Sequence, residues 1–214
     1  MQRNMKIILG VFTSIIIIAG STVVVILLIN NDNNNGNHTI NNDPPVMEFP
    51  IENVDVLMKI DAFIWDNISG FIHDGIDFGI NDTATIIASC NMTVNDKGLF
   101  YNDIGGHWQA GASFTINDDY ELFVAFESFA QNETFGNIQL DAITVEIGQE
   151  ITKGDILGQL FYHEPGAHIH FMLHKKNVPV CPYQYFSPEA KAIFDTLWTQ
   201  IGSSSYPCNG TICY

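Results

Sequence analysis

The sequence predicts a mainly β domain with one short C-terminal helix, preceded by a transmembrane helix. Three observations support this prediction: short β-type runs separated by turn signals, a helix-start signal near the C-terminus, and a long apolar run near the N-terminus. The 214 residues, of which 46% are hydrophobic, suffice for one ordinary domain with a buried core and some appendages.

The first element is an apolar run over residues 7–29 that contains no charged residue. A helix of this length, at about 1.5 Å per residue, spans the roughly 30 Å hydrocarbon core of a bilayer. A cleaved signal peptide has a shorter apolar region, of about 7–15 residues, and ends at small residues, whereas Asn30-Asn31-Asp32 follows here. Because Arg3 and Lys6 precede the run, we predict an uncleaved anchor with residues 1–6 in the cytoplasm and the rest of the chain outside.

Asparagine-linked glycosylation signals agree with export. Six Asn-x-Ser/Thr sequons follow the apolar run, and such acceptors matter only outside the cytoplasm. They begin at Asn37, Asn67, Asn81, Asn91, Asn132 and Asn209. The sequence therefore predicts a glycoprotein.

Cysteine usage also agrees with export, because the four cysteines are even in number and all follow the apolar run. Cys208 and Cys213 bracket a turn-like stretch and would close a small terminal loop, which makes them the favoured disulfide. Cys90 and Cys181 then pair with each other or stay free.

Two stretches of the chain limit what it can bind. Residues 30–46 are rich in Asn and end near Pro44-Pro45, which predicts a flexible spacer between the membrane and the domain. The chain carries 24 acidic and 8 basic residues, for a net charge of −16. Such a surface repels phosphate backbones and anionic headgroups, so nucleic-acid binding is not expected and membrane contact is left to the apolar run.

The domain itself is expected to be built from short strands. The candidate strands are residues 54–60, 76–79, 83–89, 113–116, 120–126, 143–145, 156–161 and 168–173. Ser187-Pro188-Glu189 then predicts a helix that runs to about Gln200, because Pro suits the first helical turn and apolar residues follow at helical spacing.

Two short motifs carry the chemistry. His168 and His170 share one face of a predicted strand, because side chains alternate along a strand. In the run 71–78, His73 and Asp77 share a parity, and Gly75 between them permits close approach of another group. Two imidazoles and one carboxylate suit Zn²⁺ with an open fourth position.

Together these motifs resemble the LytM/lysostaphin-type zinc metallopeptidases, family M23. The resemblance rests on His-x-Gly-x-Asp-Phe at 73–78 and Gly-Ala-His-Ile-His-Phe at 166–171. The segment 146–158 resembles the family's V-x-x-G-Q-x-V-x-K-G-x-x-I-G hairpin, and 177–182 resembles its closing G-x-P-V-N-P. The resemblance implies an antiparallel β-sandwich with a groove over residues 47–188, followed at 189–214 by a helix and a Cys-containing tail.

The resemblance also implies roles for individual residues. His73, Asp77 and His170 would hold Zn²⁺, while His168 would take a proton from the metal-bound water. Members of the family mainly cut the peptide bridges or stems of cell-wall peptidoglycan.

One departure from the family pattern is serious. The family has a further His in a Y-A-H-L strand, but the corresponding stretch 122–129 contains none, and Phe126 or Glu127 takes its place. Glu127 could serve as the acid–base group, His163 could supply the imidazole from a loop, or hydrolysis could be lost. His163 and His107 are otherwise interpreted as loop histidines.

Two further histidines are given no role: His38 belongs to the spacer and His174 to a strand end. The leading functional prediction is a membrane-anchored, extracellular zinc peptidase that acts on envelope or surface peptides. The alternatives are a catalytically degenerate domain that binds envelope polymer or regulates a partner hydrolase, and a structural surface protein in which the cluster is incidental.

Overall fold

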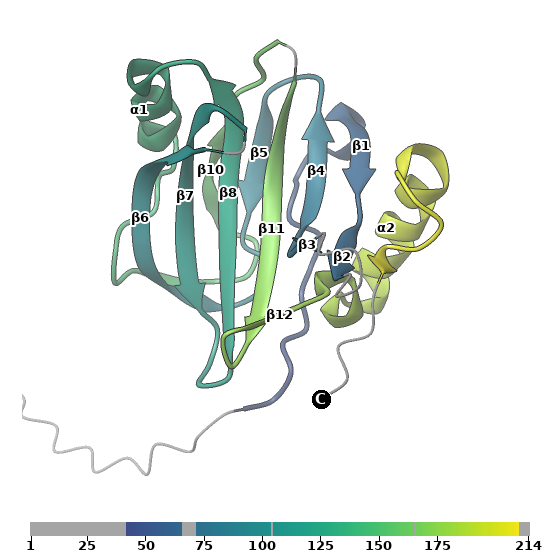
Figure 1. Ribbon diagram of the computed structural model, residues 1–214. Coiled ribbons are helices and arrows are strands. Elements are labelled where there is room, and N and C mark those ends of the chain that lie inside the picture. Colours follow the sequence, from purple (N-terminus) through teal and green to yellow (C-terminus); the bar gives the residue numbers. More distant parts are fainter. Residues whose placement is uncertain (1–41, 66–71, 104, 165, 210–214) are drawn as a thin grey trace, which may run out of the picture. The chain divides into compact units, whose positions relative to one another are not determined.

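An antiparallel sheet of eight strands forms the centre of the fold, and Figure 1 shows that it curls. The computed structural model describes residues 42–65, 72–103, 105–164 and 166–209, all within one unit that spans residues 40–214. In spatial order the strands are β1 (Leu57–Asp61), β4 (Ile76–Ile80), β11 (Ala167–Lys175), β8 (Tyr120–Ala130), β7 (His107–Thr115), β6 (Met92–Asn102) and β9 (Glu150–Ile151), while β12 (Val178–Val180) pairs with β11. The predicted mainly β, antiparallel fold is confirmed.

Smaller elements surround this sheet. Strand β5 (Ala84–Ile87) pairs with β10 (Ile156–Leu160), and β2 (Phe63–Trp65) lies between β3 (Ile72–His73) and β13 (Cys208–Asn209). The helices are α1 (Glu133–Asp141) and α2 (Pro188–Ile201), with single 3₁₀ turns η1 (Val54–Val56) and η2 (Pro182–Tyr185). Helix α1 contacts β6, β7 and β8, and α2 contacts β1 (Figure 1).

The alternation of side chains along β11 decides where the core lies. Ile169, Phe171 and Leu173 are fully buried, whereas His168 and His170 lie half-buried on the opposite face. The buried face belongs to one core cluster that also includes residues of β5 and β10. The histidine face is therefore left for the functional site.

The predicted C-terminal helix is confirmed as α2. Its start is stabilised by Ser187, whose hydroxyl accepts a hydrogen bond from the Ala190 amide, and Pro188 occupies the first turn. The apolar face buries Ala190 and Phe194, and the Phe194 ring packs against Phe78 and Phe186.

The predicted strands are confirmed in part. Residues 143–145 form only an isolated bridge through Ile143, and the run 54–60 begins as the 3₁₀ turn η1 before β1. The long strand β6 was not predicted, because Asn95-Asp96-Lys97-Gly98 has the composition of a turn. It is a strand because nine of its residues pair with β7, with a bulge at Val94/Asp96 that accommodates the polar stretch.

Helix α1 was not predicted either. Asn132 caps it by accepting a hydrogen bond from the Phe135 amide, but Gly136 interrupts the helical pattern in the sequence. A Cβ at Gly136 would lie 2.7 Å from the side chain of Leu99 and 2.9 Å from Trp108. The glycine therefore allows α1 to lie against β6 and β7, a contact that only the tertiary structure reveals.

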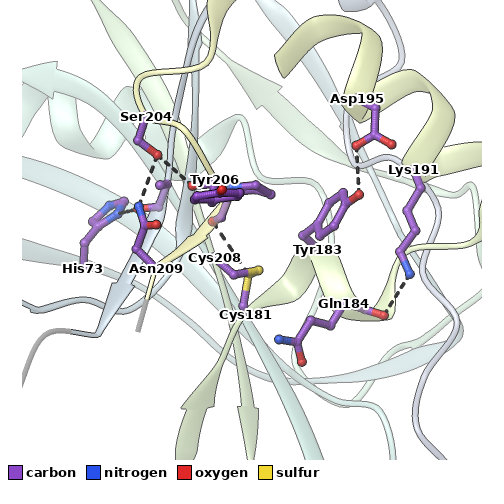
Figure 2. The surroundings of a disulfide bond; sticks show 12 residues. His73, Cys181, Tyr183, Gln184, Lys191, Asp195, Ser204, Tyr206, Cys208 and Asn209 are labelled. Atoms are coloured by element: carbon purple, nitrogen blue, oxygen red, sulfur yellow. Dashed lines mark hydrogen bonds between the residues drawn. A yellow bond between two sulfur atoms is a disulfide. The ribbon is translucent and has the colours of Figure 1, made fainter. Parts of the chain in front are cut away.

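The predicted disulfide is wrong. Cys208 pairs with Cys181 instead, as Figure 2 shows. The Cα atoms of the two residues are 5.8 Å apart. Cys208 reaches Cys181 because β13 runs alongside β2, so the end of the chain returns to the β12–η2 connection. Cys90 has no disulfide partner among the described residues, and burial raises the pKa of its thiol to about 11. Cys213 lies outside the described residues.

Neither helix of the described residues has the length and apolarity that a membrane-spanning helix requires. The predicted anchor at 7–29, the cytoplasmic segment 1–6 and most of the spacer lie outside those residues.

We predict that the Cys181–Cys208 bond stabilises the domain, because it joins residues that are 27 positions apart. Closing a loop of this length in the unfolded chain is worth about 3–4 kcal/mol of unfolding free energy. A Cys181→Ser/Cys208→Ser variant should show this loss in urea denaturation. Cys90→Ala, which removes a thiol but no cross-link, is the control, and an equal loss there would contradict the prediction.

Candidate functional site

The three residues predicted to bind metal meet on the polar face of the sheet. One ligand atom from each of His73, Asp77 and His170 lies within 4.8 Å of the other two. The Asp77 carboxylate sits between the two rings, with Oδ2 3.0 Å from His73 Nε2 and Oδ1 2.7 Å from His170 Nδ1. The predicted ligand set is therefore brought together by the fold.

Strand pairing places two of these side chains. Asp77 in β4 is the direct partner of His170 in β11, so both project from the same face. His73 arrives differently from the prediction, because the run 71–78 is not one strand. A bend at Asp74–Gly75 separates β3 from β4, and His73 pairs with Ile64 of β2 in a different sheet.

Outer hydrogen bonds orient both rings. The Nδ1–H of His73 donates to the Ala62 carbonyl at 2.6 Å, which leaves Nε2 directed at Asp77. His170 Nε2 lies 3.2 Å from Asp74 Oδ1, which leaves Nδ1 directed at the carboxylate of Asp77. Sequence analysis did not identify Asp74, although it lies between the two motif residues. A histidine whose second nitrogen bonds a carbonyl or carboxylate is the usual arrangement of a metal ligand.

The strand connection is shaped to fit the His170 ring. A Cβ at Gly75 would lie 2.7 Å from His170 Cε1 and 2.9 Å from the Phe171 carbonyl oxygen. Only glycine permits this close approach, which supports the prediction made for Gly75.

The charges of the cluster favour a bound cation. Burial would raise the pKa of Asp77, but hydrogen bonds with His170 and His73 hold it well below its usual range. Burial would lower the pKa of His170, yet its bonds to Asp74 and Asp77 raise it to about 10. The carboxylates of Asp74 and Asp77 therefore stabilise positive charge at the neighbouring ring nitrogens. A mixed set of N and O donors of this kind suits Zn²⁺.

His168 and Glu127 lie beside the metal cluster. They are direct partners across β11 and β8, whereas Phe126 pairs with Ile169 and is fully buried in the core. Glu127, and not Phe126, therefore lies on the polar face beside His168. His168 Nε2 lies 3.6 Å from Glu127 Oε2 and 3.5 Å from Asp77 Oδ2.

Each member of this pair shifts the pKa of the other. Burial would lower the pKa of His168, but the neighbouring carboxylates of Glu127 and Asp77 raise it. Burial would raise the pKa of Glu127, but His168 and His107 lower it. An ionised carboxylate facing a basic imidazole can accept, hold and return a proton.

The remaining described histidines differ in whether they contact this group of side chains. His163 is exposed, and its ring contacts Phe135 and the Glu164 carbonyl rather than this cluster. His174 lies near the end of β11 and lines a cavity of about 300 Å³ with Phe123 and Met172. His107, interpreted from the sequence as a loop histidine, is instead the first residue of β7, is 3% exposed, and bonds Glu127 at 3.0 Å. The Gly105-Gly106 turn before it is the sequence signal for that strand start.

No family model and no curated protein sequence matches this chain. Solved structures do match. A chain of the SpoIIQ–SpoIIIAH pore-forming complex superposes with a TM-score of 0.51 at 14% identity, over 71% of this chain and 98% of that one. Csd3 of Helicobacter pylori gives 0.49 at 16% identity, over 72% of this chain and 38% of that one.

The catalytic domain of the prophage-encoded M23 protein EnpA from Enterococcus faecalis gives a TM-score of 0.41 at 20% identity, over 64% of this chain and 93% of that one. This chain spans less than half the length of the Csd3 chain it matches. The superposition on the chain of the SpoIIQ–SpoIIIAH complex shows that the two share a fold. The structural neighbours of this chain include M23 peptidase domains.

Proposed function

We propose that residues 47–188 form a zinc-dependent M23-type endopeptidase domain that cuts peptide bonds in cell-envelope or surface peptides. One observation carries this proposal: the His73–Asp77–His170 donor set lies directly beside the His168–Glu127 pair on one face of the sheet. A donor set with an adjacent imidazole and carboxylate is what metal-assisted hydrolysis requires.

In this proposal the zinc ion would be held by the Asp77 carboxylate and by the nitrogens of His73 and His170 that face it. When bound there, the ion would lower the pKa of a water molecule and polarise the scissile carbonyl. His168 accepts the water proton at Nε2, where the charges of Asp77 and Glu127 stabilise the imidazolium. Glu127 Oε2 lies 3.6 Å from His168 Nε2, so a closer approach in the substrate complex would let it share that proton and return it to the leaving amine as the C–N bond breaks.

A second function is favoured by a specific feature, the carboxylate of Glu127. The family places an imidazole there to steady negative charge on the carbonyl oxygen, and a carboxylate would oppose that charge. A domain that keeps the metal but binds an envelope polymer or regulates a partner hydrolase is the alternative. A neighbour of the same fold occurs in the SpoIIQ–SpoIIIAH pore-forming complex, so the fold also takes part in protein assemblies.

We further propose that residues 7–29 anchor the domain in a membrane with residues 1–6 in the cytoplasm. The support is the uncharged run and the position of Arg3 and Lys6 before it. The disulfide between Cys181 and Cys208 suits an oxidising compartment.

We expect one zinc ion per chain, held by His73, Asp77 and His170. Replacing any one with Ala should lower zinc content and thermal stability, because binding energy contributes to folding. Gly75→Ala should weaken zinc binding by about 10- to 100-fold by displacing the His170 ring. Gly98→Ala is the matched control, because a Cβ there meets no atom within 4 Å. Stoichiometric zinc in the triple Ala variant would refute the assignment.

We expect the zinc-loaded chain to hydrolyse a quenched-fluorescent peptide library. His168→Ala should keep its zinc yet lose about 10²–10⁴-fold in turnover, and Glu127→Gln should lose a comparable factor. His163→Ala should be unaffected, since His163 does not contact the cluster. Full zinc occupancy without hydrolysis in the wild-type chain would instead favour the binding function, and Glu127→His would then test whether the family residue restores activity.

We expect the domain to be exposed on the outside of cells that produce the full chain. Protease added to intact cells should remove it, with detergent-lysed cells as the positive control. A domain that is digested only after lysis would contradict the proposed orientation.

A further inference from the structure

His107 is a buried histidine to which the proposed mechanism gives no task. Its ring lies on the same face as the metal cluster, and Nε2 is 3.0 Å from Glu127 Oε2. The other nitrogen, Nδ1, is buried and has no hydrogen-bond partner among the described residues. A proton on Nδ1 would therefore be unsatisfied, so the tautomer with its proton on Nε2, donated to Glu127, is favoured.

The surroundings of His107 are fitted to its ring. A Cβ at Gly105 would lie 2.3 Å from His107 Cε1, so the turn before β7 admits the ring only because it has glycine there. On the other side, the ring centroid of Phe129 lies 4.6 Å from that of His107 and 5.4 Å from that of His168. Phe129 adopts a φ of 51°, which is strained for a bulky residue.

A bulge in β8 brings Glu127 to this position. Trp108 pairs with Ala130 and Ala110 with Phe126, so between these pairs β7 contributes one residue and β8 contributes three. Bulges of this kind redirect side chains and recur beside active sites. Here the extra residues include Glu127 and the strained Phe129.

Both oxygens of Glu127 are held from β7. Oε2 accepts from His107, and Oε1 accepts from Gln109 Nε2 at 3.4 Å. Gln109 is oriented in turn by Asn102, whose amide donates to Gln109 Oε1 at 2.9 Å. Glu127 is only 7% exposed, so these two donors replace water and fix the direction in which the carboxylate faces His168.

We propose that His107 and Gln109 are positioning residues that hold the Glu127 carboxylate against His168. The His107–Glu127 pair comes from two neighbouring strands, β7 and β8. In this proposal it replaces the single histidine that M23 domains carry in the strand corresponding to β8. The inference rests on the proposed function for its catalytic consequence, but the contact itself can be tested without turnover.

The first test is NMR of the full chain with ¹⁵N-labelled histidine, loaded with zinc. The His107 ring should carry its proton at Nε2. His107→Leu should shift the ring nitrogens of His168, whereas His107→Gln, which keeps a donor for Glu127, and His163→Leu should leave them nearly unchanged. A His107 ring protonated at Nδ1, or His168 signals indifferent to His107→Leu, would overturn the proposal. Zinc content of each variant checks that the fold is intact.

The second test is kinetic. With one zinc per chain retained, His107→Leu should lower kcat on the peptide library by about 10- to 100-fold with little change in KM, and His107→Gln should recover most of it. In the Glu127→Gln background His107→Leu should lower kcat little further, because both substitutions disrupt the same His107–Glu127 pair. Equal losses in both backgrounds would overturn the proposal. A wild-type chain that hydrolyses nothing would refute the peptidase function alone, and the NMR result would still decide the positioning role.

Discussion

The register of three strands, β4, β11 and β8, is the constraint on which the site depends. It sets Asp77 opposite His170 and Glu127 opposite His168, all on one face. Because side chains alternate, the same register sends Ile169 and its neighbours into the core. A slip of one residue in β11 would bury the imidazoles and expose the apolar side chains, so core formation itself enforces the geometry of the site.

The polar face is stable only as a set. Carboxylates and imidazoles alternate across it, from Asp74 and His170 through Asp77 to His73, and from His168 through Glu127 to His107. In a half-buried environment each of these groups would be costly alone, and pairing offsets that cost. A cation bound among His73, Asp77 and His170 would replace protons on the two rings. The carboxylates that stabilise those protons would then stabilise the charge of the cation.

The small β13–β2–β3 sheet also contributes a residue to the polar face. His73 belongs to the small β13–β2–β3 sheet, and the Cys181–Cys208 bond ties β13 to the segment that follows β12 (Figure 2). The Nδ1 of His73 bonds the carbonyl of Ala62, just before β2. The small sheet, the disulfide and the orientation of one proposed ligand are thus parts of one local structure.

The mainly β fold and helix α2 could be predicted from the sequence alone, because strand alternation and helix capping are local properties. The meeting of His73, Asp77 and His170 was predicted through the resemblance of two short motifs to the M23 family, but His73 reaches Asp77 across a bend and not along one strand. Only the tertiary structure decided four features: strand β6, helix α1, the disulfide partner of Cys208, and the placement of Glu127 on the polar face while Phe126 is buried. The same is true of the contact between His107 and Glu127, which are twenty positions apart and meet through the pairing of β7 with a bulged β8. Such contacts depend on register and bulges between distant segments, which no local pattern of residues encodes.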